Sequence, residues 1–154
     1  MILAKRQKLI GVQAERLVEL AEFRYRLRRF LGFSEAATEE EGISAQQYQL
    51  LQVVATVPDS RESSISYIAE RMLLRHNSAV ELVDRATRSG LVRRVADETD
   101  HRKSLVEITE KGGRLLVTLM EAHLQEIETE GPEMLRALRQ LIGSCQAGKR
   151  NGTR

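Results

Sequence analysis

The sequence predicts a mainly α-helical fold that carries one small β-hairpin, an α+β arrangement within a chain of 154 residues. Over most of the chain apolar residues recur every three or four positions, which is the spacing of one face of a helix. After Gly90 the spacing changes to two short runs that are typical of strands. Hydrophobic residues make up 42% of the chain, enough for a folded core. No apolar run approaches the roughly 20 residues needed to cross a bilayer, so no membrane contact is expected.

The first element is expected to be one long helix from about residue 9 to residue 31, ended by Gly32. Its apolar stripe is formed by Leu9, Val12, Leu20, Phe23, Leu27 and Phe30. Such a helix is about 35 Å long, whereas a domain of this size has a radius of gyration of only about 15 Å. The stripe is therefore expected to extend beyond one subunit and to need a partner. The acidic stretch 33–43 is expected to be a loop or a weak helix.

The central part of the chain predicts a helix-turn-helix. A helix begins at Ser44, which fits a capping box, and ends before Pro58. Ser64 can cap a second, short helix, and a break at residues 73–76 leads to a third helix that ends at Gly90. The apolar face of that third helix is formed by Ala79, Leu82, Val83 and Ala86. Two short helices joined by a tight break make a helix-turn-helix pattern.

Two strands and further helices complete the prediction. Residues 91–95 and 104–108 are expected to form strands, with the polar residues 96–103 at the hairpin tip. A helix-turn-helix followed by a two-stranded ribbon is the arrangement of a winged helix. Thr109 is a good N-cap for a helix that runs to about residue 130, with a soft spot at Gly112-Gly113. Gly131-Pro132 is expected to break this helix, a final helix covers residues 134–142, and the tail 148–154 is expected to be disordered.

The net charge of +2 conceals a segregation of charge along the chain. Residues 1–32 have a net charge of +5 and residues 33–62 a net charge of −5, which suggests separate functional faces. The cluster Arg24, Arg26, Arg28 and Arg29 is expected to lie at the rim of a dimer interface or of a ligand cleft, or to pair with the acids of 33–62.

Several chemical functions lack any sequence support. The chain has one cysteine, Cys145, which excludes an internal disulfide framework, fits a cytoplasmic protein and is interpreted as a buried or incidental thiol. The histidines His76, His101 and His123 lack metal-ligand spacing, so neither a metal site nor a cofactor is expected. The start of the chain does not read as a secretory signal. No catalytic triad, phosphate-binding loop or paired-carboxylate motif is present, so the chain is not expected to be an enzyme.

Five short motifs of the central region stand out: Ile68–Met72, Val83–Arg85, Gly90–Arg94, Asp100–Arg102 and Leu105–Gly112. Together they resemble the motifs of the multiple antibiotic resistance regulator (MarR) family of bacterial transcription factors. The specific signature is Asp-x-Arg followed at a fixed distance by an apolar residue, Thr and x-x-Gly, and the resemblance covers about residues 9–146. It implies a winged helix on an all-helical dimerisation region built from both chain ends. It also implies a homodimer that binds a palindromic DNA operator, usually as a repressor released by small ligands or oxidants.

The resemblance divides the chain into four parts. Residues 1–43 would form the first dimerisation helix and a connector, residues 44–112 the winged helix, residues 113–147 the C-terminal dimerisation helices and residues 148–154 a tail. Within the winged helix, the helix face from 77 to 88 would read bases in the major groove. In the wing, Arg102, oriented by Asp100, would reach the minor groove or a phosphate, and Arg94 and Lys103 would contact phosphates. The predicted DNA-binding residues are Ser64, Arg75, His76, Asn77, Ser78, Glu81, Arg85, Arg94, Asp100, Arg102 and Lys103.

Two positions depart from the family pattern. Arg75 occupies a position that is often an acidic helix cap, which allows the recognition helix to begin later, at Asn77 or Ser78. Glu81 stands where the family often has a basic or neutral residue, and its carboxylate would accept from cytosine N4 and repel phosphate. Glu81, Asp97 and Glu98 also support an alternative, a winged-helix protein-interaction module that does not bind DNA. A DNA binder that responds to no ligand is a third alternative.

The resemblance also implies a cleft for a small-molecule effector. The expected lining residues are Phe23, Arg26, Phe30, Tyr48 and Leu116. A basic rim would suit an anionic aromatic compound. For the aromatic residues, ordinary core packing is the competing interpretation.

Overall fold

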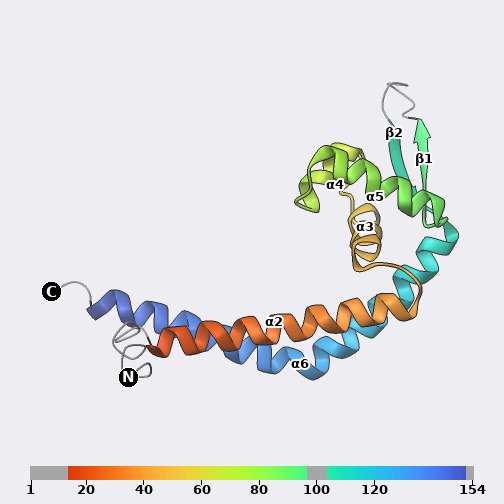
Figure 1. Ribbon diagram of the computed structural model, residues 1–154. Helices are drawn as coiled ribbons and strands as arrows, with labels where there is room; N and C mark the ends of the chain where they lie inside the picture. Colours follow the sequence, from red (N-terminus) through yellow and green to blue (C-terminus); the bar gives the residue numbers. More distant parts are fainter. Residues whose placement is uncertain (1–13, 97–103, 152–154) are drawn as a thin grey trace, which may run out of the picture. The chain divides into compact units, whose positions relative to one another are not determined.

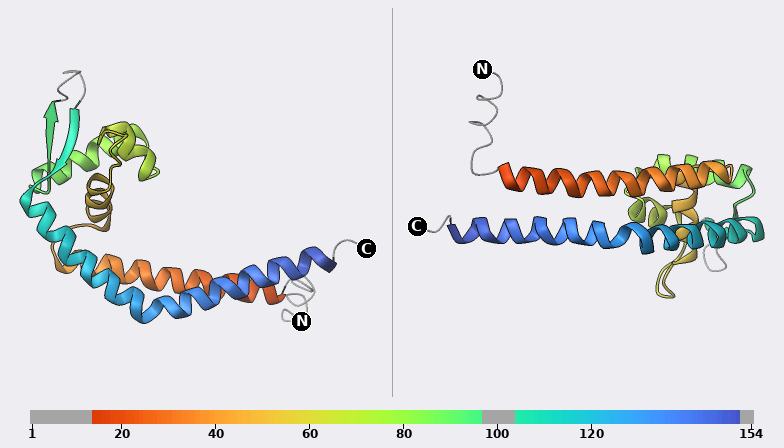
Figure 2. Two further views of the ribbon diagram at one scale, coloured as in Figure 1. Left: turned by 180° about the vertical axis from the view of Figure 1, so that it is seen from behind. Right: turned by 90° about the horizontal axis from the view of Figure 1, so that it is seen from below.

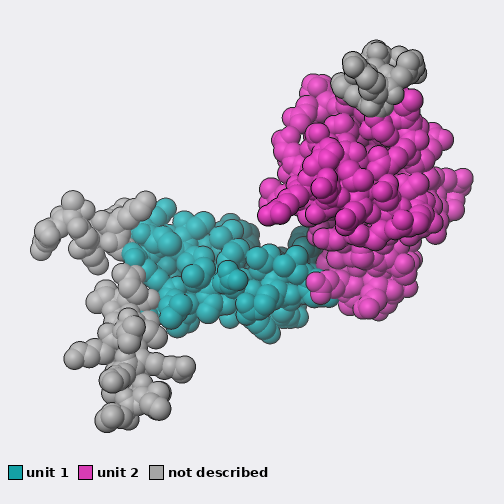
Figure 3. Space-filling model, turned by 45° about the horizontal axis from the view of Figure 1, so that its top comes forward, with its two compact units in different colours: residues 1–33, 124–154 teal, residues 34–123 magenta. Residues whose placement is uncertain are grey.

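The computed structural model describes residues 14–96 and 104–151, and side chains as far as residue 146 (Figure 1). The elements are α2 (Ala14–Glu40), α3 (Ala45–Ala55), α4 (Ile65–Arg71), α5 (His76–Arg88), β1 (Val92–Ala96), β2 (Ser104–Ile108) and α6 (Glu110–Asn151). The chain divides into two compact units, shown in Figure 3: unit 1 holds residues 1–33 and 124–154, and unit 2 holds residues 34–123. The predicted fold, mainly α with one antiparallel hairpin, is confirmed.

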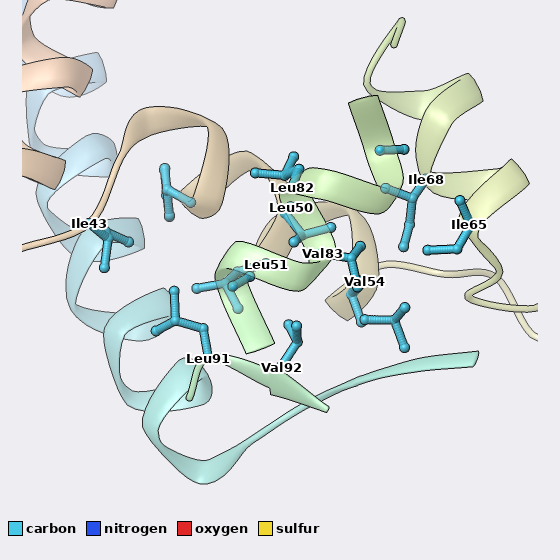
Figure 4. Close-up of a cluster of buried hydrophobic side chains, with 14 of the residues drawn as sticks. Ile43, Leu50, Leu51, Val54, Ile65, Ile68, Leu82, Val83, Leu91 and Val92 are labelled. Carbon is cyan, nitrogen blue, oxygen red and sulfur yellow. The ribbon is translucent and has the colours of Figure 1, made fainter. Parts of the chain in front are cut away.

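The core of unit 2 lies between α3, α4, α5 and the hairpin. Figure 4 shows Leu50, Leu51, Leu82 and Val83 meeting there, and all four are fully buried. Leu91 and Val92 add the start of the hairpin to the same cluster. The short helices are thereby fixed by burial of one face each, since helices of 7 to 13 residues are marginal on their own.

Side-chain caps begin three helices as the sequence predicts. Ser44 and Gln47 form the capping box of α3, and the Ser64 hydroxyl accepts a hydrogen bond from the Tyr67 amide at 3.2 Å. The Thr109 hydroxyl accepts from the Gly112 amide at 3.1 Å at the start of α6. The expected later start of the third helix is wrong, because α5 begins at His76 with Arg75 as an N-cap that makes no side-chain cap bond.

The ends of α2 and α6 differ from the prediction. α2 does not stop at Gly32 but continues to Glu40, so most of the acidic stretch is helical. The helix ends where Gly42 takes φ 73°, and the Gly42 and Ile43 amides then bond to the Glu39 and Thr38 carbonyls, both at 3.0 Å. Among the described glycines of this region, Gly42 adopts the left-handed conformation that commonly ends a helix, whereas Gly32 does not.

α6 is a single helix from Glu110 to Asn151, so two further expectations were wrong. Pro132 lies inside the helix instead of ending it. A proline removes one backbone amide hydrogen bond, and a long helix whose other turns are packed tolerates that loss. Residues 148–151 are helical and not part of a disordered tail.

Of the pair Gly112-Gly113, which was expected to be a soft spot, Gly112 makes a tight contact. A Cβ on Gly112 would lie 2.1 Å from the Leu91 carbonyl oxygen, so α6 packs its backbone directly on the start of β1. The same atom on Gly113 would meet only Ile108 Cγ2, at 4.0 Å.

The hairpin is antiparallel, with Val92 opposite Ile108 and Ala96 opposite Ser104. β1 therefore begins one residue later than predicted. A further antiparallel bridge joins Ser64 to Leu105, so the segment before α4 pairs with the free edge of β2. The tip at 97–103 lies outside the described residues.

Unit 1 consists of the N-terminal part of α2 and the C-terminal part of α6, which lie side by side in opposite directions (Figure 2). Arg29 bonds Glu130 at 3.1 Å, and the Arg16 guanidinium donates to the Ser144 carbonyl at 3.2 Å. Large apolar side chains remain exposed on both helices of this unit: Leu17, Val18, Leu20, Tyr25, Leu27, Leu31, Leu124, Ile127, Leu135, Leu138 and Ile142. Within the described ranges, no helix is long and apolar enough to cross a membrane.

Candidate nucleic-acid interface

Helix α5 has two sharply different faces. Ala79, Leu82, Val83 and Ala86 are all fully buried in the core of unit 2. The opposite face carries exposed polar and charged side chains: His76, Asn77, Ser78, Glu81, Arg85 and Arg88. The buried face holds the helix rigidly, so the exposed face is presented in a fixed geometry. A rigid helix with such a face can enter the major groove of DNA.

The charges on this face are those expected of a DNA-binding helix. Arg75, Arg85 and Arg88 are exposed, and none has an ion-pair partner among the residues that the structure describes. Glu81 is an exposed acidic residue on the same face, next in sequence to Leu82 of the buried face. Three guanidinium groups and one carboxylate leave this surface basic, and Arg85 can bind a guanine edge through two parallel hydrogen bonds.

Arg93 and Arg94 of β1 are held by carboxylates of the same chain. Arg94 Nη2 lies 2.9 Å from Asp84 Oδ1, which joins β1 to α5. Arg93 pairs with the opposite residue Glu107 at 2.7 Å. The Asp84–Arg94 pair was missed in the sequence, because Asp84 lies at the boundary between the two faces of α5 and spacing alone does not assign it a partner in the next element.

The structure gives Ser64 a local role, since its hydroxyl caps α4 and its backbone pairs with Leu105. The predicted wing residues Asp100, Arg102 and Lys103, and the tip acids Asp97 and Glu98, lie outside the described residues. Their roles therefore stay predictions.

The five predicted effector residues fall into different units. Phe23, Arg26 and Phe30 belong to unit 1, whereas Tyr48 and Leu116 belong to unit 2. Tyr48 is almost completely buried, with its ring centroid 4.7 Å from that of His123, and this burial raises the pKa of the Tyr48 hydroxyl. Its observed contacts are those of a core residue.

Two arginines of the basic cluster of α2, Arg26 and Arg29, are paired within unit 1. Arg26 Nε lies 2.8 Å from Glu22 Oε1, and this hydrogen bond raises the pKa of Arg26. Arg26 also lies 3.7 Å from Glu130, the residue that binds Arg29. Within this chain the partners of these two arginines are thus Glu22 and Glu130, and pairing with the acids of 33–62 of a second subunit stays a prediction.

Other chemistries find no site in the part of the chain that the structure describes. No group of three or more His, Cys, Asp and Glu side chains there could hold a metal ion. Cys145 is exposed near the end of α6 and forms no disulfide, so of the two expected alternatives the buried thiol is excluded and the incidental thiol stays a prediction.

The fold and the exposed helix define a winged-helix protein. Residues 41–103 match the model of the MarR family. The chain is 28% identical over 110 residues to a putative transcriptional regulatory protein for the hcr operon of Thauera aromatica, and covers 64% of the length of that relative and 68% of its own.

Solved structures share the fold. A mutant of MepR from Staphylococcus aureus is 18% identical, covers 80% of this chain and 95% of its own, and superposes with a TM-score of 0.68. Another MepR mutant, bound to an oligodeoxyribonucleotide, is 19% identical over 80% of this chain and 94% of its own, with a TM-score of 0.61. CouR from Rhodococcus jostii RHA1, bound to p-coumaroyl-CoA, is 24% identical over 73% of this chain and 83% of its own, with a TM-score of 0.57.

These findings confirm the family resemblance predicted from the sequence: residues 41–103, which hold most of the winged helix, match the MarR family. Proteins of this family are transcriptional regulators and not enzymes, as the sequence predicts.

Proposed function

We propose that this protein is a homodimeric, sequence-specific DNA-binding regulator of transcription that places α5 in the major groove. The observation that carries the proposal is the polar, basic face of α5, which lies opposite a face of four fully buried side chains. The names of the relatives support it, since the Thauera protein is described as a transcriptional regulator and a MepR structure holds an oligodeoxyribonucleotide.

Each side chain of the proposed interface has a chemical role. Arg85 reads a guanine, Arg88 contacts phosphates, and Glu81 accepts a hydrogen bond from cytosine N4. Asp84 holds the Arg94 guanidinium beside α5 at 2.9 Å, so the wing approaches the phosphates in a fixed position relative to the recognition helix. The tip residue Arg102, oriented by Asp100, is proposed to contact the minor groove or a phosphate, next to Lys103.

The DNA-binding proposal is tested by titrating a fluorescent duplex from the region next to the gene for this protein. Arg85→Ala is expected to lower the affinity about 10- to 100-fold, which corresponds to the loss of one specific arginine–guanine contact. Arg136→Ala, on unit 1, also removes an exposed arginine and is the control, expected to leave the affinity unchanged. Affinity should also fall steeply as salt rises. No binding at micromolar dimer, or no salt dependence, would contradict the proposal and favour a protein-interaction module.

The dimer is proposed from the exposed apolar side chains of unit 1. A monomer would leave Leu135 46% exposed and Ile142 48% exposed, together with the other apolar residues of both helices. Many exposed apolar side chains on one pair of helices favour an interface, and the two ends of the chain would supply it. In a twofold dimer the two α5 helices would enter major grooves about 34 Å apart, so the operator is expected to be an inverted repeat.

The dimer is tested by sedimentation of Leu135→Glu. A buried charge at the interface should shift the protein toward the monomer at micromolar concentration. Val117→Glu, which changes a side chain that is 50% exposed on unit 2, is expected to leave the dimer intact. A dimer that tolerates Leu135→Glu would show that this surface is not the interface.

The proposed mode of regulation is repression relieved by a small anionic aromatic effector. The support is the predicted basic and aromatic set around Phe23 and Arg26, and the CouR structure with p-coumaroyl-CoA. In thermal-shift experiments with aromatic acids and their thioesters, an effector should stabilise the protein and release the DNA. If no such compound does both, a DNA binder without an effector is the better description.

A further inference from the structure

Three helices of unit 2 end in the same hydrogen-bonded turn. In α2 and α5 the left-handed position of this turn is occupied by Gly42 at φ 73° and Gly90 at φ 70°. In α4 it is occupied by Leu73 at φ 54°. The amides of Leu73 and Leu74 bond to the Glu70 and Ala69 carbonyls at 3.3 and 2.9 Å, as in the other two turns. The three turns have the same hydrogen bonds, but the turn after α4 has leucine at the position where glycine is favoured.

Packing does not explain the choice of leucine. The left-handed conformation is unfavourable for a side chain with a Cβ and for a bulky one is a genuine outlier. The Leu73 side chain is 93% exposed, so no free energy of side-chain burial offsets the backbone strain. The next residue, Leu74, is the one that packs against the core. Glycine at position 73 would make the same turn without strain.

The surroundings of Leu73 point to DNA as the surface that it touches. It lies in the turn between α4 and α5, directly before the exposed residues that open the recognition helix. Arg71 and Arg75 stand two positions away on either side, both exposed and without an ion-pair partner among the described residues. An apolar side chain between two cations suits a polyanion that also offers apolar groups. The apolar groups of the major groove are the thymine 5-methyl groups.

We propose that Leu73 makes an apolar contact with a thymine methyl group at the edge of the groove that α5 enters. The strained residue is thus a specificity-determining residue of the DNA interface. This inference rests on the proposed function, since it needs the α5 face to bind DNA.

The first test compares stability and affinity in three variants. The probe is a duplex of about 30 base pairs that the wild-type dimer selects from a randomised library. Leu73→Gly removes both the strain and the side chain, Leu73→Ala removes the side chain but keeps the Cβ strain, and Leu73→Met keeps a large apolar side chain. Leu73→Gly should raise the Tm by about 2–4 °C. Both Leu73→Gly and Leu73→Ala should bind the duplex about fourfold more weakly per half-site, the effect of losing one buried methyl group. Leu73→Met should bind like the wild type.

The second test removes the methyl group from the DNA. Thymines of the selected duplex are replaced one at a time by deoxyuridine, which changes nothing but the 5-methyl group. At one position in each half-site the replacement should weaken the wild type about fourfold and leave Leu73→Gly unchanged.

The outcomes separate this inference from the proposed function. If the wild type selects no duplex, the proposed function fails and this inference fails with it. If the wild type binds but Leu73→Gly binds equally tightly, gains no Tm, or responds to deoxyuridine as the wild type does, the role of Leu73 is overturned while the proposed function stands.

Discussion

Two adjacent glycines of α6 should respond in opposite directions to the same substitution. Gly112→Ala places a methyl group 2.1 Å from the Leu91 carbonyl oxygen, 3.0 Å from the Leu91 carbonyl carbon and 3.1 Å from Leu51 Cδ2. An ordinary carbon–oxygen contact is about 3.3 Å or longer, so the overlap with the oxygen exceeds about 1 Å. The atom that must move is backbone and not the end of a flexible side chain.

Displacement of the Leu91 carbonyl would also weaken the hydrogen bonds that it accepts. The Leu91 oxygen accepts from the Thr109 amide at 3.1 Å and lies 3.1 Å from the Thr109 hydroxyl. Overpacking costs about 1–3 kcal/mol, each weakened hydrogen bond adds about 1 kcal/mol, and alanine returns about 1 kcal/mol of helix propensity. The expected net loss for Gly112→Ala is therefore about 2–4 kcal/mol of unfolding free energy.

The matched control is Gly113→Ala, whose new methyl group would lie 4.0 Å from Ile108 Cγ2. That distance is ordinary contact, so the propensity gain remains and the variant should be stabilised by up to about 1 kcal/mol. Urea unfolding at one fixed protein concentration measures both, with an unchanged m-value as the sign that the unfolded state is the same. If Gly112→Ala proves as stable as the wild type, the close approach of α6 to β1 is not what requires glycine.

Three further predictions concern single groups. Thr109→Ala should lower the unfolding free energy by about 1–2 kcal/mol in urea titrations, because it removes the N-cap of α6. Thr109→Ser should retain most of the stability of the wild type. An unchanged unfolding free energy for Thr109→Ala would show that the cap is unimportant. Arg94→Ala should change the unfolding free energy by less than about 1 kcal/mol, since the Asp84–Arg94 pair is largely exposed. In DNA titrations it should lower the slope of log K against log salt by about 1. An unchanged slope would show that Arg94 does not contact the DNA. Because burial raises the pKa of Tyr48 above its value in the unfolded chain, the stability that this group contributes is complete below about pH 10 and is lost as pH rises above it. Tyr48→Phe should unfold like the wild type at pH 7 and decline less above pH 10, and identical alkaline declines would contradict this reasoning.

Local signals in the sequence were sufficient for most of unit 2. The capping box at Ser44, the cap at Ser64 and the end of α5 at Gly90 involve residues a few positions apart, so their hydrogen bonds are formed within the segment that specifies them. The periodicity of residues 77–88 likewise separated the buried and exposed faces of α5 before any packing was known. Of these features, Gly90 and the Val83–Arg85 part of α5 also belong to the motifs that carry the family resemblance.

Tertiary packing decided the features that have no local signal. Gly32 and Gly42 are both plausible helix stops, and it is the second that is followed by a residue packed into the core, Ile43. Pro132 was expected to break the last helix, but the helix continues through it. The Asp84–Arg94 pair and the approach of Gly112 to Leu91 join residues of different elements, so spacing within one element does not reveal them.

The sequence by itself therefore determined the order of the elements, the winged helix and the face of α5 proposed to meet DNA, because capping, turn chemistry and apolar periodicity act over a few residues. Only the tertiary structure decided where the long helices end, which carboxylate holds Arg94, and that a leucine occupies a conformation suited to glycine at position 73. Those features depend on how separate segments pack together and on the backbone conformation of a single residue, and neither is encoded in the local pattern.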